Sequence, residues 1–285
     1  WFSAHARDLP WRLRRTSYRV GRAEIMLQQT RAEAVVPYYR RFLKRFPSLR
    51  SLADAPRGDV LKQWEGLGYY GRARHLHDAA RIVVDEHGGR IPRTLDGLRA
   101  LPGIGPYTAA AIGSLAFGLD AAVVDGNVIR VLARLTALDD PIDRAAGKRA
   151  VEKTARDLLP SGRAGEWNEA VMELGALVCT PSSPACGRCP LRSHCKAYAE
   201  GRPADFPVRG KKKPVPHKVV GAGVVVDRRG RFLIAQRRET AMLGGLWEFP
   251  GGKLEAGETL PSCIRRELRE ELGIRVRIGE RLAVI

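Results

Sequence analysis

Four cysteines between residues 179 and 195 form a compact group with the potential for metal chemistry. They are Cys179, Cys186, Cys189 and Cys195, with the spacing C-x6-C-x2-C-x5-C. We expect no secretory segment, and a disulfide framework is unusual in such a chain, so four thiolate ligands around a metal centre are favoured. All-cysteine zinc sites usually have two close pairs; one central pair with an outlier on each side suits an iron–sulfur cluster at least as well. The fifth cysteine, Cys263, is expected to be a small buried hydrophobic residue.

Two acidic residues lie beside apolar stretches, where burial changes the chemistry of a carboxyl group. Glu24 is followed by Ile25–Leu27, and an apolar pocket there would raise its pKa into the range of a general acid. Asp125 follows the apolar run 121–124 at the expected start of a helix. Simpler interpretations stay open, with Glu24 as an ion-paired helix residue and Asp125 as a helix N-cap. Because the two residues are far apart in the sequence, no spacing argument brings them together.

The segment Leu101–Gly105 (LPGIG) is expected to be a tight turn between two helices. Its two glycines, Gly103 and Gly105, allow close backbone approach and leave N–H groups free at the start of the next helix. This arrangement suits an anion such as a DNA phosphate. A G-x-G pair alone is weak support for a phosphate site, since most such turns bind no anion. The whole string through Ala111, however, resembles a helix-hairpin-helix motif.

A second motif lies in residues 252–274. The pattern G-x5-E-x7-REL-x-EELGI matches every fixed position of the Nudix box, and the preceding string LWEFPGG (246–252) fits the same family. This resemblance implies that Glu267, Glu270 and Glu271 share a helix face and bind Mg²⁺ against the bridge of a nucleoside diphosphate. The alternative is an ordinary charged and solvated helix.

Helices must position most of these residues, because the sequence before residue 200 has almost entirely helical patterns. Helical periodicity covers Tyr18–Thr30, Ala32–Arg45, Val60–Leu67, Arg72–Glu86, Leu95–Ala100, Tyr107–Phe117, Asn127–Ala137, Arg144–Leu159 and Glu166–Val178. After residue 217 the pattern becomes β-like. The segments Val219–Asp227 and Arg231–Gln236 predict a hairpin, and a helix is expected over about Leu260–Leu272, ended by Gly273.

Four prolines and a run of three lysines interrupt these patterns between residues 200 and 217, which indicates a linker. We therefore expect a mainly α helix-hairpin-helix domain over residues 1–199, which includes the four-cysteine loop at 179–195. The linker follows at 200–217. Residues 218–285 are expected to be the N-terminal part of an α/β Nudix-type domain, truncated at its C-terminal end. The chain also begins at Trp1 without a methionine, so we expect it to be a fragment.

The composition narrows the class of partner. The apolar share of 44% is sufficient for a packed core, and no stretch approaches the length of a membrane span. The formal net charge is +18. From Lys218 onward 13 basic and 9 acidic residues give +4, which leaves +14 for the first 217 residues. Such charge indicates a polyanionic partner, and the alternatives are an anionic membrane surface or a basic surface without a partner.

Several strings together identify a family resemblance over about residues 1–199. They are LPWR (9–12), EIMLQQT (24–30), GLGYY (66–70), the hairpin, and VDGNV (124–128). They resemble the helix-hairpin-helix DNA glycosylases, and within these the adenine DNA glycosylases of the MutY type. The resemblance implies a [4Fe–4S] cluster on the four cysteines. The bifunctional branch of the superfamily has a lysine nucleophile after the hairpin, where this chain has Tyr107, so a strand-cutting lyase is disfavoured.

The resemblance also implies roles for the site residues. Removal of adenine breaks an N-glycosidic bond, which is helped by protonation of a ring nitrogen and by a carboxylate that stabilises the oxocarbenium-like sugar. The resemblance implies that Glu24 is the acid and that Asp125 is the cation stabiliser or a transient nucleophile, with Tyr107 and Asn127 as supports of Asp125. It places Glu169 and Arg12 near the adenine and makes Trp11 a wall of the adenine pocket. Gln29 and Tyr69 would act at the opening that base flipping leaves in the duplex. Core packing is the alternative for Trp11 and for Tyr69.

The function expected is that of a monofunctional glycosylase of base excision repair, which excises adenine opposite 8-oxoguanine or guanine in double-stranded DNA. The second candidate is a Nudix pyrophosphohydrolase of oxidised nucleoside triphosphates, or a parent protein with both activities. The third is a DNA-binding module without catalysis. We expect a cytoplasmic, nucleoid-associated bacterial protein that acts as a monomer and has no membrane partner.

Overall fold

A computed structural model describes residues 1–210, 216–238 and 244–284. The chain divides into two compact units, Trp1–Lys211 and Lys212–Ile285, and each is described by itself. Within the described residues, no helix is both long and apolar enough to cross a membrane.

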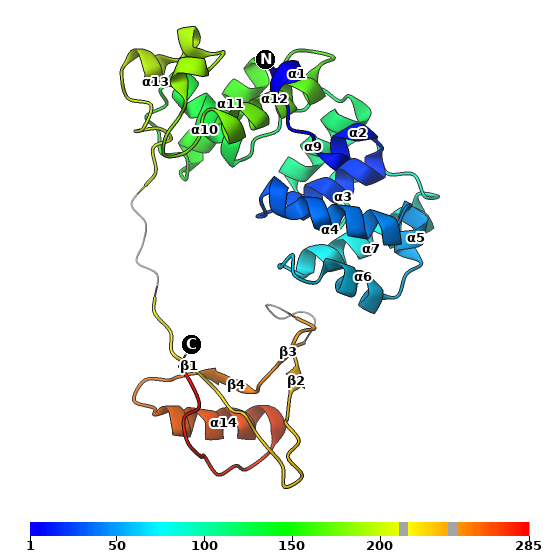
Figure 1. The fold of residues 1–285 in the computed structure, drawn as a ribbon, viewed down its shortest axis with the longest axis vertical. Coiled ribbons are helices and arrows are strands. Elements are labelled where there is room, and N and C mark those ends of the chain that lie inside the picture. Colours follow the sequence, from blue (N-terminus) through cyan, green and yellow to red (C-terminus); the bar gives the residue numbers. More distant parts are fainter. Residues whose placement is uncertain (211–215, 239–243, 285) are drawn as a thin grey trace. The chain divides into compact units, whose positions relative to one another are not determined.

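The first unit is helical, as the sequence predicts (Figure 1). Its helices are α1 (Phe2–His5), α2 (Pro10–Leu13), α3 (Ser17–Leu27), α4 (Ala32–Arg45), α5 (Leu49–Ala53), α6 (Arg57–Trp64), α7 (Gly71–Glu86), α8 (Leu95–Arg99), α9 (Pro106–Phe117), α10 (Gly126–Thr136), α11 (Ala145–Asp157), α12 (Ala164–Leu177) and α13 (Lys196–Ala199). Two short 3-10 helices, Cys186–Arg188 and Arg192–His194, lie in the cysteine loop. The short helices α1, α2, α5 and α13 were not expected from the sequence pattern, because each has only one turn.

Local signals fix several helix ends. The Thr16 side chain caps α3 by accepting a hydrogen bond from the N–H of Arg19. Pro106 occupies the first turn of α9, where its missing N–H costs nothing. Asp125 caps α10, and its Oδ1 accepts from the N–H of Val128 at 2.7 Å. The predicted N-cap role of Asp125 is therefore confirmed, and it fixes where this carboxyl group lies.

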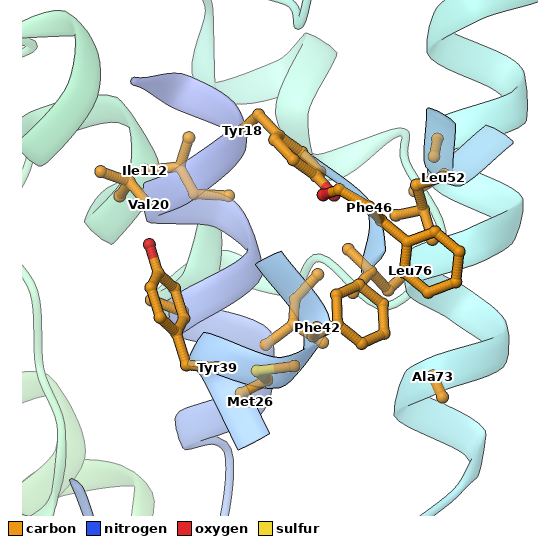
Figure 2. Packing of buried hydrophobic residues seen from close by; sticks show 14 of the residues in the cluster. Tyr18, Val20, Met26, Tyr39, Phe42, Phe46, Leu52, Ala73, Leu76 and Ile112 are labelled. Carbon is orange, nitrogen blue, oxygen red and sulfur yellow. The ribbon is translucent and has the colours of Figure 1, made fainter. Parts of the chain in front are cut away.

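Two main apolar cores and a small cluster of Ala110, Ala111, Ala121 and Val123 hold the helices of this unit together. The larger one is formed by α2–α9, and Figure 2 shows Phe42, Phe46, Leu52 and Leu76 gathered within it. The Tyr18 hydroxyl donates to the carbonyl of Phe46 at 2.9 Å, which satisfies its buried polar atom. The second core lies among α10, α11 and α12. Helix α9 contacts α3 from the first group and α12 from the second, so residues of both groups can meet at its first turn.

The end of α3 differs from the prediction. The periodicity indicated a helix through Thr30, but α3 ends at Leu27, and Gln29 has a left-handed backbone with φ +57°. The predicted helix Val60–Leu67 likewise stops at Trp64, before Gly66 with φ +90°. In both places a residue with a left-handed backbone follows within two residues of the last helical residue, which the sequence pattern did not indicate.

The linker was predicted to begin at residue 200, but the packed part of the first unit extends beyond this residue. Residues 206–210 pack against the first unit, and Phe206 is only 2% exposed. The carbonyl of Phe206 accepts from Arg134 Nε at 3.0 Å, and the carbonyl of Val208 accepts from the N–H of Ile142 at 3.0 Å. One buried aromatic side chain therefore anchors a proline-rich segment whose pattern indicated no packing. Residues 211–215, which include the lysine run, lie outside the described residues.

The second unit combines short strands with one helix. The strand β1 (Val220–Ala222) pairs antiparallel with β4 (Gly251–Lys253), and β2 (Ala235–Gln236) pairs with β3 (Trp247–Glu248). Helix α14 (Leu260–Leu272) contacts β1 and β4 and ends at Gly273, as predicted. The predicted hairpin is shorter than expected, since one antiparallel bridge, Val226 to Phe232, joins its arms. This is consistent with part of a Nudix-type domain.

Candidate active site

A cavity of about 570 Å³ in the first unit brings most of the predicted catalytic and base-binding residues together. Its walls come from α2, α3, α9, α10 and α12, elements that are far apart in the sequence. The predicted residues that line it are Trp11, Arg12, Glu24, Gln29, Tyr107, Asp125, Asn127 and Glu169. The two carboxylates that no spacing argument could connect, Glu24 and Asp125, therefore face one space.

Glu24 lies on α3 and is only 5% exposed. The Tyr107 hydroxyl, in the first turn of α9, donates to Glu24 Oε2 at 3.2 Å. Burial raises the pKa of Glu24 to about 7; the Tyr107 hydrogen bond opposes this, and the negative charges of Asp125 and Glu169 add to it. Near neutral pH this carboxyl group can therefore carry a proton and give it up.

Asp125 has a more polar surrounding. Its Oδ1 accepts from the N–H of Val128, and its Oδ2 accepts from Asn127 Nδ2 at 2.9 Å. Burial raises its pKa, while these hydrogen bonds lower it. Arg130 fixes the orientation of the amide, because its Nη2 donates to Asn127 Oδ1 at 2.7 Å and its Nε donates to the carbonyl of Cys179 at 2.6 Å.

Two further glutamates on α12 form hydrogen bonds with three arginines at the cavity wall. Glu169 accepts from Arg15 Nη2 at 2.6 Å and from Arg12 Nε at 3.3 Å. Glu173 accepts from Arg12 Nη2 at 3.1 Å and from both the backbone N–H (2.7 Å) and Nη2 (2.9 Å) of Arg7. Although burial acts to raise the pKa of Glu173, the hydrogen bonds from Arg7 and Arg12 lower it to about 2.

Four residues of the site were not predicted from the sequence: Arg7, Arg15, Arg130 and Glu173. Glu173 lies four residues after Glu169, on the same face of α12, which is the one signal that pointed to it. Nothing in the spacing of Arg7 and Arg15 relates them to α12, because their contacts join residues more than 150 positions apart.

Tyr69 and the hairpin glycines do not line the cavity. Tyr69 is 58% exposed, so the core-packing interpretation of this residue is wrong. Trp11, by contrast, is 8% exposed and both belongs to the larger core and lines the cavity. The hairpin lies between α8 and α9, with Gly103 at φ +75° and Gly105 as the exposed N-cap of α9. A Cβ at Gly103 would approach the His75 Cβ to 2.7 Å, so glycine is required there.

The four cysteines surround a second, smaller cavity of about 30 Å³. Arg134 Nη1 donates to Cys179 Sγ at 3.3 Å, and Cys195 Sγ donates to the Arg134 carbonyl at 3.4 Å. Within the described residues, no group of three or more His, Cys, Asp or Glu is placed to hold a metal ion. A lone zinc ion needs its sulfur ligands at about 2.3 Å from one point. A cluster of several irons spreads its thiolates more widely, so the donor set fits an iron–sulfur cluster better.

The three Nudix glutamates lie on α14 in the second unit, where Arg266 occupies the space among the acidic groups. Its Nη1 donates to Glu267 Oε1 at 3.0 Å and to Glu270 Oε2 at 3.2 Å, and its Nη2 donates to Glu258 at 3.0 Å. Burial, followed by the charge of Glu267, raises the pKa of Glu271. In this arrangement the carboxylates do not converge as ligands of a magnesium ion.

Comparison with known families matches three segments of the chain. Residues 23–161 match the HhH-GPD superfamily of base excision DNA repair proteins. Residues 179–195 match the iron–sulfur binding domain of endonuclease III, which agrees with the donor set of the four cysteines. Residues 216–285 match the NUDIX domain.

Solved structures support the fold of the first unit. A thermostable thymine-DNA glycosylase superimposes with a TM-score of 0.63 and 32% identity, over 70% of this chain and 92% of that one. Endonuclease III in a non-covalent complex with DNA gives a TM-score of 0.59 at 26% identity, over 70% of this chain and 91% of that one. The shared part is the helical unit with its hairpin.

Curated relatives identify the family more closely. The adenine DNA glycosylase of Mus musculus is 38% identical over 90% of this chain and 60% of its own length. That of Buchnera aphidicola subsp. Baizongia pistaciae is 34% identical over 88% of this chain and 71% of its own length. This chain spans less than two thirds of the mammalian relatives. Because the bacterial relative is 34% identical and this chain covers more than two thirds of its length, the chain belongs to the adenine DNA glycosylase family.

Proposed function

We propose that this chain excises adenine mispaired with 8-oxoguanine or guanine from double-stranded DNA, as a glycosylase of base excision repair. The observation that carries the proposal is the pair of carboxyl groups on one cavity, one of which has a pKa of about 7. A buried acid that holds its proton near neutral pH is what a poor nitrogen leaving group requires. The names of the curated relatives support adenine as the base.

The reaction proceeds through charge separation at the sugar. The carboxylic acid of Glu24 gives its proton to a ring nitrogen of adenine, and the electron pair of the N-glycosidic bond leaves with the base. The sugar becomes an oxocarbenium-like cation, which the carboxylate of Asp125 stabilises by its charge or by a transient covalent bond. Water then adds to the anomeric carbon and gives one proton to the Glu24 carboxylate, which restores the acid for the next turnover. Asn127 and Tyr107 keep the two carboxyl groups in place through the hydrogen bonds described above.

The adenine is held by the polar wall of the cavity. Glu169, with Arg12 and Arg15 beside it, offers a carboxylate acceptor for the exocyclic amine of the base. Trp11 supplies an apolar wall. Gln29 and Tyr69 act at the opening that base flipping leaves in the duplex, and the backbone at Gly103 and Gly105 binds a phosphate.

The enzyme removes the base without cutting the strand, because Tyr107 stands where a lyase carries its nucleophilic amine. The test is a duplex with adenine opposite 8-oxoguanine, incubated with the chain and then treated with alkali or left untreated. We expect strand cleavage only after alkali, which breaks the abasic site. Absence of cleavage in both samples would contradict the glycosylase activity. Cleavage without alkali would contradict the monofunctional assignment.

We propose further that Cys179, Cys186, Cys189 and Cys195 hold a [4Fe–4S] cluster. When bound, the cluster supplies a covalent crosslink of the loop 179–195, and this orders the basic side chains of the loop toward DNA. The chain's own contribution is the guanidinium of Arg134, which donates to Cys179 Sγ and to the carbonyls of Thr180 and Pro181. Visible absorption together with a ratio of four iron and four sulfide per chain tests this cluster. Zinc in place of iron would contradict it.

A Mg²⁺-dependent Nudix hydrolase is the second candidate, supported by the complete set of fixed positions in the motif. The ion pairs of Arg266 with Glu267 and Glu270 oppose it, because they occupy groups that the ion needs. We assign no step to magnesium in this chain. Release of pyrophosphate from an oxidised nucleoside triphosphate in the presence of Mg²⁺, lost in Glu270→Gln, would reinstate this candidate. We propose that the protein acts on DNA as a cytoplasmic monomer.

A further inference from the structure

Two side chains of the first unit combine exposure with a strained backbone, and both belong to segments that face DNA in the proposed function. Gln29 is exposed with φ +57°, and Tyr69 is 58% exposed with φ +49°. Ala137 is the third residue other than glycine with a positive φ in the described part of the chain. A left-handed backbone costs a residue with a side chain about 1–2 kcal/mol. Tertiary contacts must therefore hold these two conformations.

One side chain, that of Arg72 on α7, supplies these contacts to both segments. On the side of Gln29, its Nη1 donates to the carbonyls of Ile25 (3.3 Å), Met26 (2.7 Å) and Gln28, and its Nη2 donates to Thr30 Oγ1 at 3.2 Å. These carbonyls lie at the C-terminal end of α3, where no further helical N–H reaches them. The guanidinium therefore replaces the helical turn that the sequence pattern predicted.

The same guanidinium binds the segment of Tyr69. Nη2 donates to the carbonyls of Leu67 at 3.3 Å and of Gly68 at 3.1 Å. The Arg72 guanidinium also lies 5.3 Å from the Trp64 ring and 5.4 Å from the Tyr69 ring. The indole Nε1 of Trp64 donates to the Gly68 carbonyl at 2.9 Å, so the loop is fixed from two sides.

Burial makes this arrangement specific. Arg72 is 8% exposed and Trp64 is fully buried, so carbonyls that lost the guanidinium would have little access to water. A planar guanidinium can serve several carbonyls in fixed directions, whereas a lysine ammonium is a single point with three donors. The Gln29 segment is also tied to the hairpin, since Gln28 Nε2 donates to Thr108 Oγ1 at 3.1 Å and to the Gly103 carbonyl at 3.3 Å.

We propose that Arg72 is a positioning residue that holds the segments of Gln29 and Tyr69 in one fixed arrangement, so that both side chains enter the duplex together when the adenine is flipped. The proposal rests on the proposed glycosylase function. Arg72 touches neither the cavity nor the carboxyl groups that act on the bond. It acts on the cost of opening the duplex, before the chemical step.

The test compares Arg72→Lys with the wild-type chain, and Arg41→Lys is the matched control. Arg41 donates to the carbonyls of Gln63 and Glu65 on the other side of the same loop, but it contacts neither Gln29 nor Tyr69. Amide hydrogen exchange is measured in the segments 28–30 and 67–70 without DNA. We expect faster exchange in both segments in Arg72→Lys and in neither segment in the control. Faster exchange in one segment alone, or in none, would overturn the proposal.

Single-turnover adenine release separates positioning from a general loss of structure. The adenine is placed opposite guanine in one duplex and opposite an abasic site, where it is already unpaired, in the other. We expect Arg72→Lys to lower the rate on the paired substrate by roughly 10²-fold, the loss that a misplacement of about 1 Å can cause. The rate on the unpaired substrate should stay close to that of the wild type. Equal losses on both substrates would overturn the positioning role.

A milder variant covers the case in which Arg72→Lys does not fold. Thr30→Val removes the contact of Arg72 Nη2 with Thr30 Oγ1, together with the long hydrogen bond from Thr30 Oγ1 to the Gln28 carbonyl at 3.4 Å. The ratio of the rate on the paired substrate to the rate on the unpaired substrate is expected to fall by a smaller factor than in Arg72→Lys. An unchanged ratio would contradict the proposal. If the wild-type chain releases adenine from neither duplex, the proposed function is wrong. Hydrogen exchange then still decides whether Arg72 couples the two segments.

Discussion

Glu24 and Glu173 are both almost completely buried, yet their pKa values lie far apart. Glu24 has one uncharged hydrogen-bond donor, Tyr107, and burial raises its pKa to about 7. Glu173 receives two guanidinium groups, and its pKa falls to about 2 despite its burial. The same residue type can thus hold a proton near neutral pH in one place and is a fixed anion in the other, and the neighbouring groups decide which.

The rate of adenine release should depend on pH in a way that follows from these groups. Glu24 must carry its proton, so we expect the single-turnover rate to fall about tenfold for each pH unit above about 7. Asp125 must be ionised, so the rate should also fall at acid pH, and burial brings this fall to a higher pH than an exposed aspartate would give. A rate that stays constant from pH 6 to pH 9 would contradict the role of Glu24.

The free energy of unfolding should depend on pH, because the carboxyl group of Glu24 is buried. The pKa of Glu24 is higher in the folded chain than its ordinary value of 4.5, so the folded state holds the proton more tightly. Ionisation therefore lowers stability as the pH rises from about 4.5 to about 7, by roughly 3 kcal/mol in total. We expect Glu24→Gln to have a higher free energy of unfolding in urea than the wild type at pH 8. The difference should shrink at pH 5, and a lower stability at pH 8 would contradict this account.

At the scale of elements, helix α3 carries an unusual residue on its buried face. Arg22 is fully buried, and its three guanidinium nitrogens have no hydrogen-bond partner among the described residues. Its guanidinium lies between the rings of Tyr18 (4.9 Å) and Tyr39 (4.3 Å). The two ring contacts recover part of the cost of taking this charge out of water.

Replacement of Arg22 by an apolar side chain should stabilise the first unit. We expect Arg22→Met to raise the free energy of unfolding by roughly 1–3 kcal/mol, because the desolvated charge without acceptors is removed and the volume is kept. Urea denaturation measures the change. Arg41→Met serves as the control, since Arg41 also lies over a tyrosine ring, Tyr38, but donates to carbonyls; it should not stabilise. A destabilised Arg22→Met would show that the ring contacts outweigh the desolvation cost.

The sequence predicted which helices form better than it predicted where the helices end and which residues they bring into contact. The prediction Ala32–Arg45 agrees with α4 and Leu260–Leu272 agrees with α14, because amphipathic periodicity and caps are local properties. The end of α3 was missed because Arg72, over forty residues away, takes the carbonyls there. The contacts of Arg7 with Glu173 were missed for the same reason, as they depend on the packing of the N-terminal segment against α12.

The whole molecule carries its charge unevenly. The first 217 residues hold +14 of the formal +18. Since these residues include the cavity, the hairpin and the exposed Tyr69, the charge and the site belong to the same unit. Basic side chains bind DNA by releasing counterions from its phosphates, and this binding is independent of sequence.

The affinity for an undamaged duplex should therefore depend strongly on salt. We expect the dissociation constant to rise roughly tenfold or more between 50 and 200 mM salt, as several phosphate contacts would give. Fluorescence anisotropy of a labelled duplex measures this. Single-turnover adenine release at saturating enzyme should change much less, because in the proposed reaction the DNA is already bound when the chemical step takes place. An affinity that does not respond to salt would contradict binding through the basic unit.

In the proposed reaction the buried carboxyl group of Glu24 gives its proton to the departing adenine, and the substitution Glu24→Gln is the sharpest test of this step. The change keeps the size of the side chain and an acceptor for the Tyr107 hydroxyl, but removes the acid. With a duplex that has adenine opposite 8-oxoguanine, binding and single-turnover adenine release are measured on the variant and on the wild type. We expect an unchanged dissociation constant and no detectable adenine release from the variant. Release at the wild-type rate by a folded Glu24→Gln chain would contradict it.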